Sequence, residues 1–308
     1  MQHYASLQAV NVQDAWLTIG AFDGVHLGHR QILQELTAGA HASGAPAVVL
    51  TFFPHPMVVL RGPQPNFYLT SPKEKAALLA EAGVDIVITH PFDHVVSQIA
   101  ARDFVQDLKQ HLGLAKLWVG HDFALGRNRE GDIPALQQFG TEMGFSVQVV
   151  EEVTGNGAVI SSSLIRRALQ AGDVRQAADW LGRPYNVDGK IVHGDGRGRT
   201  IGIPTANIEY WPERVIPAKG VYACRAQVNG QTWESVTNIG VRPTFDVDAV
   251  QTNVETHLLD YDGGEIYGQR LKLEFLAHIR DEQRFSGVDE LVAQIHRDIE
   301  TARQVLQT

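Results

Sequence analysis

The chain has 308 residues, of which 44% are hydrophobic and 20% charged, and its formal net charge is −9. This length accommodates two domains of ordinary size, and the composition is typical of a soluble globular protein. There is no run of about eighteen apolar residues, and the first residues lack the basic start and apolar core of a signal peptide. The single cysteine excludes an internal disulfide, and the acidic balance disfavours broad nucleic-acid binding. We therefore expect a cytoplasmic protein that binds neither membranes nor nucleic acids.

Strands and helices alternate up to residue 150. The predicted strands are Trp16–Ile19, Ala47–Phe53, Asp85–Thr89, Lys116–Gly120 and Ser146–Val150. The predicted helices are His29–Ala42, Pro72–Ala82, Ala101–Leu112 and Pro134–Met143. This alternation predicts a Rossmann-like α/β domain, in which helices cover both faces of a parallel sheet. Ligands of such sheets bind at the carboxyl ends of the strands, so the segments that follow strands are the candidate site.

The segment Gly20–His29, GAFDGVHLGH, lies between the first predicted strand and the first predicted helix. Its glycines let the backbone approach a ligand, and the start of the next helix offers free N–H groups to a phosphate. His26 and His29 can each donate a hydrogen bond to a phosphate oxygen. The run His26-Leu27-Gly28-His29 resembles the HxGH signature of the nucleotidyltransferase superfamily. In isolation, two histidines at this place also suit helix capping.

Three later segments follow predicted strands and reach the same edge of the sheet. They are Thr51–Pro56 (TFFPHP), Val119–Asp132 (VGHDFALGRNREGD) and Ile160–Arg167 (ISSSLIRR). Each has a purely structural alternative, since prolines end strands, arginines occur in solvated loops and serines cap helices. Their common position at one edge favours a shared ligand site.

Beyond Arg183-Pro184-Tyr185 the pattern changes to short alternating runs separated by Gly and Pro. The predicted strands of this half are Val187–Val192, Gly220–Val228, Thr232–Asn238, Asn253–Leu259 and Arg270–Ile279. The predicted helices are Ser163–Ala171 and Asp173–Leu181 before the change, and Val288–Leu306 at the end of the chain. The strand pattern predicts a small antiparallel β-barrel, with a hairpin turn at Asn229-Gly230. We therefore expect two domains, at residues 1–183 and 184–308.

The second domain begins with a Gly- and Arg-rich segment, His193–Asn207, HGDGRGRTIGIPTAN. Its glycines and arginines can wrap a polyphosphate with backbone N–H groups and positive charge. Pro204 stiffens the turn before Thr205, whose hydroxyl can bind Mg²⁺, and Asn207 can hold the shell of the ion or phosphate. A flexible surface loop is the alternative, and the Pro-Thr-Ala-Asn ending argues against it.

Taken together, these segments resemble the bacterial bifunctional riboflavin kinase/FAD synthetase family over nearly the whole chain. Further matching segments are PAKGVYA at 217–223, NIGVRPTF at 238–245, VETHLLD at 254–260 and the stretch 265–280. Two positions depart from the family pattern: Leu125 stands where an aromatic residue is frequent, and Ser163 where Thr is common. The resemblance implies two reactions. The first domain adenylylates FMN with ATP to FAD and pyrophosphate, and the second phosphorylates riboflavin with ATP to FMN and ADP.

The resemblance also implies the residues of each site. In the adenylyltransferase site His26 and His29 are catalytic, and the residues that bind ATP and phosphate are Gly20, Phe22, Gly24, Gly28, Asp122, Arg127, Ser162 and Arg166. In the kinase site Glu255 is the general base, and ATP and flavin are bound by Gly194, Gly196, Gly198, Arg199, Gly202, Pro204 and Arg242. Thr205 and Asn207 hold Mg²⁺. The implied partners are small molecules, with at most weak self-association.

Glu255 lies in an alternating run, Asn253–Leu258, whose two faces differ in character. Val254, Thr256 and Leu258 share one face, which suits burial, so Glu255 on the other face should point into a site or into solvent.

A function of another class also fits part of the sequence. The first domain could transfer a nucleotide to a different substrate, while the β domain serves only as a binding or regulatory module that senses anions. The combination of Thr205, Asn207 and Glu255 discriminates between the two, because a pure binding module needs no carboxylate beside a transferable phosphate.

Overall fold

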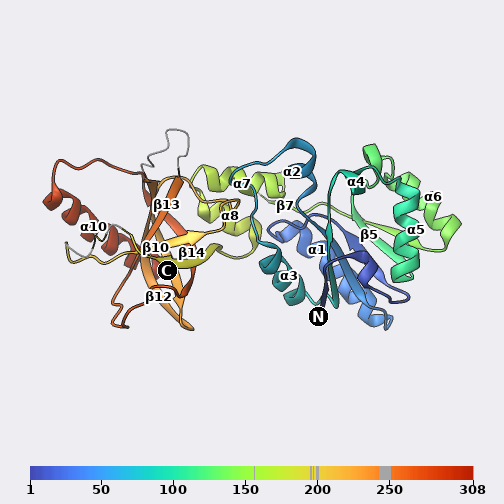
Figure 1. Ribbon diagram of the computed structural model, residues 1–308, viewed down its shortest axis with the longest axis horizontal. Helices are drawn as coiled ribbons and strands as arrows, with labels where there is room; N and C mark the ends of the chain where they lie inside the picture. The colour runs from blue at the N-terminus through green and yellow to red at the C-terminus, as the bar shows by residue number, and fades with distance from the viewer. Residues whose placement is uncertain (156, 195, 197, 199–200, 243–250, 308) are drawn as a thin grey trace. The chain divides into compact units, whose positions relative to one another are not determined.

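The computed structural model describes residues 1–155, 157–194, 196, 198, 201–242 and 251–307. Contacts divide the chain into two compact units, one made of Met1–Gln64 and Tyr68–Ser162, the other of Pro65–Phe67 and Ser163–Thr308. The first is an α/β unit and the second contains a β-barrel (Figure 1). The predicted fold class is therefore confirmed.

The first unit is built on a six-stranded parallel sheet with the strand order β1-β4-β3-β2-β5-β6. Its strands are β1 (Gln2–Tyr4), β2 (Trp16–Ile19), β3 (Ala47–Phe53), β4 (Ile86–Pro91), β5 (Lys116–Gly120) and β6 (Ser146–Val150). Its helices are α1 (Leu27–Ala42), α2 (Pro56–Arg61), α3 (Pro72–Glu81), α4 (His94–Ser97), α5 (Ala101–Leu112) and α6 (Ile133–Met143). Two 3₁₀ turns, η1 (Leu7–Ala9) and η2 (Arg127–Arg129), and a small hairpin, β7 (Thr154–Gly155) with β8 (Ala158–Val159), complete it.

Successive residues of the central strands point into two different hydrophobic layers. Leu17 and Val48 pack in the layer that contains α5 and α6, whereas Trp16 and Val49 pack in the layer that contains α1 and α3 (Figure 1). Strand β2 lies between β3 and β5, so Gly20 follows β2 at the centre of the sheet's carboxyl edge. The fold thus puts the predicted nucleotide loop where parallel sheets bind ligands.

Local signals explain how the two helices next to this loop begin. Helix α3 starts with a complete capping box, because Ser71 accepts a hydrogen bond from the Glu74 N–H and the Glu74 carboxylate accepts one from the Ser71 N–H. Helix α1 begins at Leu27, two residues earlier than predicted, because the His26 ring caps it. Residues His26–His29 are therefore the first turn of a helix.

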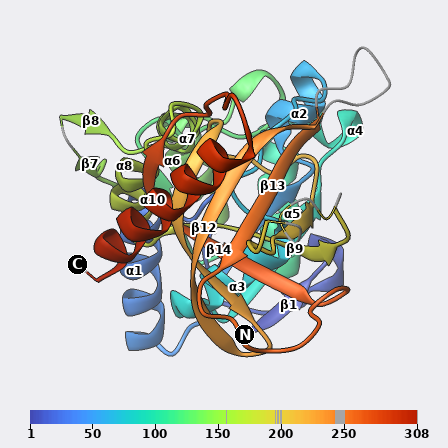
Figure 2. The ribbon, with the colours of Figure 1, turned by 90° about the vertical axis from the view of Figure 1, so that its left-hand side faces the viewer.

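The second unit is a closed antiparallel barrel with the strand order β10-β13-β12-β11-β14-β9. Its strands are β9 (Tyr185–Val192), β10 (Ala206–Tyr210), β11 (Gly220–Val228), β12 (Gln231–Arg242), β13 (Gln251–Leu258) and β14 (Arg270–Arg280). Its helices include α7 (Ser162–Gln170), whose first residue is counted with the first unit, α8 (Val174–Leu181) and α10 (Val288–Leu306). Helix α10 packs along β11, β12 and β14, as predicted for a helix on the barrel surface (Figure 2).

The structure groups α7 and α8 with the barrel, whereas the sequence places them in the first domain. Helix α8 contacts β9 and β14 of the barrel, and its buried residues include Val174, Ala177 and Trp180. The structural boundary therefore lies near residue 162, about twenty residues before the predicted one. Among the described residues, no helix is both long enough and apolar enough to cross a lipid bilayer.

Candidate active sites

The first candidate site is the loop Gly20–His26 and the first turn of α1. The His26 and His29 rings are stacked, with 3.6 Å between their centroids, and the Nδ1 atom of His26 accepts a hydrogen bond from the His29 backbone N–H at 3.4 Å. Since Nδ1 is an acceptor, the neutral His26 ring carries its proton on Nε2 and can donate there. Gly28 permits this packing, because a Cβ at that position would lie 3.2 Å from the His26 ring.

The His29 imidazole is electrostatically biased toward its neutral form. Burial lowers the pKa of His29 well below its usual value, and the neighbouring His26 and Lys75 lower that pKa further. Its Nδ1 atom is sealed from solvent and has no hydrogen-bond partner among the described residues. A sealed polar atom costs free energy unless a ligand group satisfies it, so this ring suits a bound phosphate oxygen.

Two residues of the loop have a left-handed backbone conformation, which is energetically unfavourable for residues other than glycine. Phe22 and Val25 have φ angles of 47° and 40°, in the left-handed region that a β-branched residue rarely enters. The Asp23 carboxylate accepts hydrogen bonds from the backbone N–H groups of Leu69 and Thr70, at 3.0 and 3.1 Å. The predicted phosphate ligand Ser162 donates its hydroxyl to the Asp23 carbonyl at 2.8 Å, so in this structure it fastens the loop.

An apolar cavity of about 460 Å³ opens beside the start of the loop. Gly20 and Ala21 form part of its wall, and the rest is rich in aromatic and aliphatic side chains, namely Phe52, Met57, Leu60, Phe92, Phe104, Phe123 and Leu125. Phe52 and Phe92 meet edge to face, with 5.3 Å between ring centroids. A flat heteroaromatic ring is the kind of ligand that such a cavity favours.

The arginines predicted for this site have different positions. Arg127 and the Asp122 side chain are exposed, and the cavity wall is formed instead by Asn128 and Arg129. Arg129 donates to the Asp122 carbonyl, which fixes the turn between them. Arg166 belongs to the second unit, where its guanidinium stacks 4.1 Å from the centre of the Phe67 ring and donates to the Phe67 carbonyl.

The second candidate site is built on strands β10, β12 and β13 of the barrel. Glu255 pairs in register with Asn207 of β10 on one side and with Asn238 of β12 on the other. Val254 and Thr256 are buried and Glu255 is half-buried, so the predicted division of faces is confirmed. The Asn253 amide donates to the Glu255 carboxylate at 2.6 Å and fixes its orientation.

The Gly-rich segment approaches these strands closely where it is described. Gly194 packs against the Asn207 amide so tightly that a Cβ there would overlap it. Gly198 accepts a hydrogen bond from the Ile203 N–H at 2.9 Å, and Gly196 and Gly202 have φ angles of 72° and 78°. The predicted ligand Arg199 and the Arg242 side chain lie outside the described residues.

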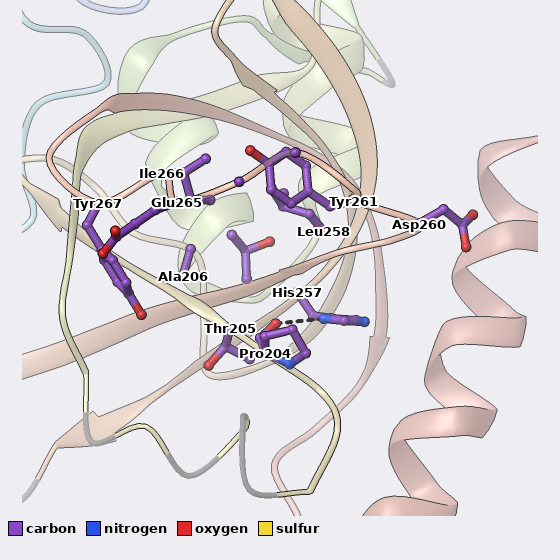
Figure 3. A pocket seen from close by; sticks show the side chains of 13 residues that line it. Pro204, Thr205, Ala206, His257, Leu258, Asp260, Tyr261, Glu265, Ile266 and Tyr267 are labelled. Atoms are coloured by element: carbon purple, nitrogen blue, oxygen red, sulfur yellow. Dashed lines mark hydrogen bonds between the residues drawn. The ribbon is translucent and has the colours of Figure 1, made fainter.

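Two cavities meet at Thr205 and His257, which line both of them. The larger, of about 620 Å³, has Thr205, Pro204 and His257 along one side and Tyr261, Glu265 and Ile266 opposite (Figure 3). The smaller, of about 350 Å³, is lined by Glu255 and, among others, by apolar residues of the barrel, of α10 and of the segment before α10: Val221, Val236, Phe285, Leu291 and Ile295. His257 donates from Nδ1 to the Pro204 carbonyl at 2.7 Å and thereby fixes the turn before Thr205.

The structure adds three residues beside these candidate sites that the sequence did not single out as site residues: Lys75, Arg129 and His257. Lys75 precedes the buried Leu79 by one helical turn, and a lysine on an apolar helix face was a signal available in the sequence.

Both halves of the chain match known protein families. A family model for FAD synthetase matches residues 8–164, and one for riboflavin kinase matches residues 181–306. The bifunctional riboflavin kinase/FMN adenylyltransferase of Escherichia coli (strain K12) is 41% identical over 290 residues, which cover 94% of this chain and 91% of that protein. The chain belongs to this bifunctional family. The Bacillus subtilis (strain 168) member is 36% identical over 288 residues, covering 93% of this chain and 90% of that protein.

Family membership establishes the activities: the chain phosphorylates riboflavin to FMN and adenylylates FMN to FAD. The alternative in which the β domain only binds or regulates is thereby set aside. A solved structure described as a macrolide-efflux protein from Streptococcus pneumoniae has a TM-score of 0.89 and 28% identity, covering 98% of each chain. It shares the fold of this chain, and the activity in its description is stated of that protein.

Proposed function

We propose that FMN adenylylation takes place at the loop Gly20–His29 and that riboflavin phosphorylation takes place around Glu255, each with ATP as the donor. The functional boundary at residue 183 and a cytoplasmic location stay predictions from the sequence.

For adenylylation, the aromatic cavity suits the flavin ring, and Gly20 and Ala21 join that cavity to the histidine pair. The phosphate of FMN is already anionic, so its attack on the α-phosphorus of ATP needs no general base. It needs alignment and neutralisation of the charge that develops in the transition state. The acceptor role of His26 Nδ1 places the ring proton on Nε2, which can donate, and the His29 Nδ1, which has no partner among the described residues, supports a second contact in the same site.

For phosphorylation, the apolar cavity beside α10 suits the flavin ring of riboflavin, and the larger cavity suits the nucleotide. The observation that carries this assignment is that Thr205 lines both cavities while Glu255 faces the flavin side. The attacking ribityl hydroxyl benefits from a base. The carboxylates that line this cavity are Glu255, Glu282 and Asp298. Asp298 is paired with Arg280, and Glu255 is the one that lies in register with Asn207.

Two oxygen donors fit Mg²⁺: Thr205 at the junction of the cavities, and Asn207 two residues further on, in register with Glu255. The Thr205 hydroxyl and the buried Asn207 amide are hard ligands, and Gly194 leaves the space that the Asn207 side chain occupies. Bound there, the ion would neutralise phosphate charge. The test is the Mg²⁺ dependence of each reaction in Thr205→Val. Riboflavin phosphorylation should need roughly tenfold or more Mg²⁺, while FAD formation from supplied FMN keeps its normal dependence. Unchanged Mg²⁺ dependence of both reactions would refute this site.

A further inference from the structure

A lysine is buried directly beneath the adenylylation loop. Lys75 lies on α3, in the turn after the capping box, and only 6% of its surface is exposed. Lysine is almost never buried to this extent unless its ammonium has specific partners. The two reactions assigned above do not use it.

The ammonium joins the ends of two neighbouring strands. Its Nζ donates to the Ala21 carbonyl and to the Thr51 hydroxyl, both at 2.8 Å, and lies 3.5 Å from the Phe52 carbonyl. The Thr51 hydroxyl in turn donates to the Ala21 carbonyl at 3.0 Å. Ala21 follows β2, whereas Thr51 and Phe52 belong to the end of β3. The contacts therefore hold the first residues of the loop against the next strand.

The charge of Lys75 acts on the same site. Burial lowers the pKa of Lys75 to about 8, and the nearby Asp23 carboxylate opposes that shift, so the amine is mostly protonated at neutral pH. Its charge disfavours a second positive charge on His29, alongside the effect of His26. The two carbonyls and the hydroxyl accept its hydrogen bonds, and the Asp23 carboxylate is the nearby counter-charge, so the buried ammonium is held by residues of the loop and of β3.

We propose that Lys75 is a positioning residue of the adenylylation site: its ammonium fastens the first residues of the loop to the end of β3 and so fixes the backbone that leads to His26 and His29. The inference rests on the assignment of adenylylation to His26 and His29. It extends the site to an element, α3, whose residues the sequence motifs do not include.

The test compares Lys75→Met with Lys73→Met, an exposed lysine on the same helix, in the full-length protein. In Lys75→Met the kcat of FAD formation from supplied FMN should fall by about 10²-fold, the scale expected when reacting groups are slightly misplaced. FMN formation from riboflavin should stay within about threefold of normal, since it uses the other unit. Lys73→Met should leave both rates unchanged.

A second readout separates this role from a merely structural one. The pKa of His29, measured by NMR with ring-labelled histidine and assigned by the signal missing in His29→Ala, should rise in Lys75→Met and not in Lys73→Met. If Lys75→Met unfolds the first unit, Thr51→Val decides instead, because it removes one acceptor while the lysine stays. It should lower FAD formation roughly three- to tenfold, the usual scale for one hydrogen bond.

Normal FAD formation together with an unchanged His29 pKa in Lys75→Met would overturn the inference, as would normal FAD formation in Thr51→Val when Lys75→Met does not fold. A failure of the proposed function looks different, because FAD formation would then be normal in His29→Ala itself.

Discussion

The role of Glu255 is best tested by Glu255→Gln, which keeps the shape of the side chain and removes its basicity. The amide oxygen of Gln can still accept the hydrogen bond that Asn253 donates at 2.6 Å, and the buried neighbours Val254 and Thr256 are untouched. The barrel should therefore fold normally. Loss of a general base typically costs about 10²–10⁴-fold in rate, which corresponds to roughly 3–5 kcal/mol of transition-state stabilisation.

The assay is chromatography of flavins after incubation with riboflavin, ATP and Mg²⁺. The turnover of riboflavin to FMN should fall by the stated factor, while FAD formation from supplied FMN continues at its normal rate. Glu209→Gln is the matched control, since Glu209 is exposed on the neighbouring strand β10 and pairs in register with Lys190. Near-normal riboflavin turnover in Glu255→Gln would refute the role of Glu255 as general base. Thr205 and Asn207 would then act by positioning alone.

Further predictions concern His29, the helices packed on the barrel and the buried Lys75. His29→Ala should lower FAD formation roughly 10²–10³-fold with FMN formation nearly unchanged, as assayed by flavin chromatography, and equal loss of both activities would mean a folding defect. A fragment of residues 163–308 should fold and phosphorylate riboflavin. The shorter fragment 184–308 lacks α8, so its free energy of unfolding in urea should be several kcal/mol lower than that of 163–308. Equal free energies of unfolding would argue against packing of α8 on the barrel. The lowered pKa of Lys75 means that the unfolded chain binds more protons between about pH 8 and pH 10.5, so folding stability should rise with pH in this window. Across this pH window the free energy of unfolding of the wild-type chain should rise by about 3 kcal/mol more than that of Lys75→Met. The free energies come from urea unfolding at each pH, and an equal pH dependence in the two proteins would contradict the prediction.

Sequence spacing predicted where some candidate site residues lie, whereas their roles were implied by the family resemblance. His26 and His29 are three residues apart at a helix start, and Glu255 sits in an alternating run, so spacing predicts the position of these side chains and leaves their chemistry open. The fold class followed from the same periodicities. The sequence does not predict the short strands β1, β7, β8 and β10. β1, β7 and β8 have two or three residues each, too few for a periodic pattern, and β10 alternates only over five residues that directly follow the Gly-rich segment.

Residues that act across long sequence separations could not be predicted in this way. Lys75 contacts the carbonyl of Ala21, 54 positions away, and the contact depends on how α3 packs beneath the sheet edge. His257 reaches Pro204 only because the barrel pairs β13 with β10. For α7 and α8, amphipathic patterning predicts the helices and not the unit they pack against, which is why the structural and predicted boundaries differ.

The central claim is that two separate sets of residues carry two successive reactions in one chain. The most direct measurement mixes His29→Ala and Glu255→Gln proteins and follows the conversion of riboflavin with ATP and Mg²⁺. Alone, His29→Ala should stop at FMN and Glu255→Gln should leave riboflavin almost unchanged, whereas the mixture should produce FAD from the FMN that the first variant releases. A mixture that forms no more FAD than either variant alone, with both proteins folded, would contradict the claim.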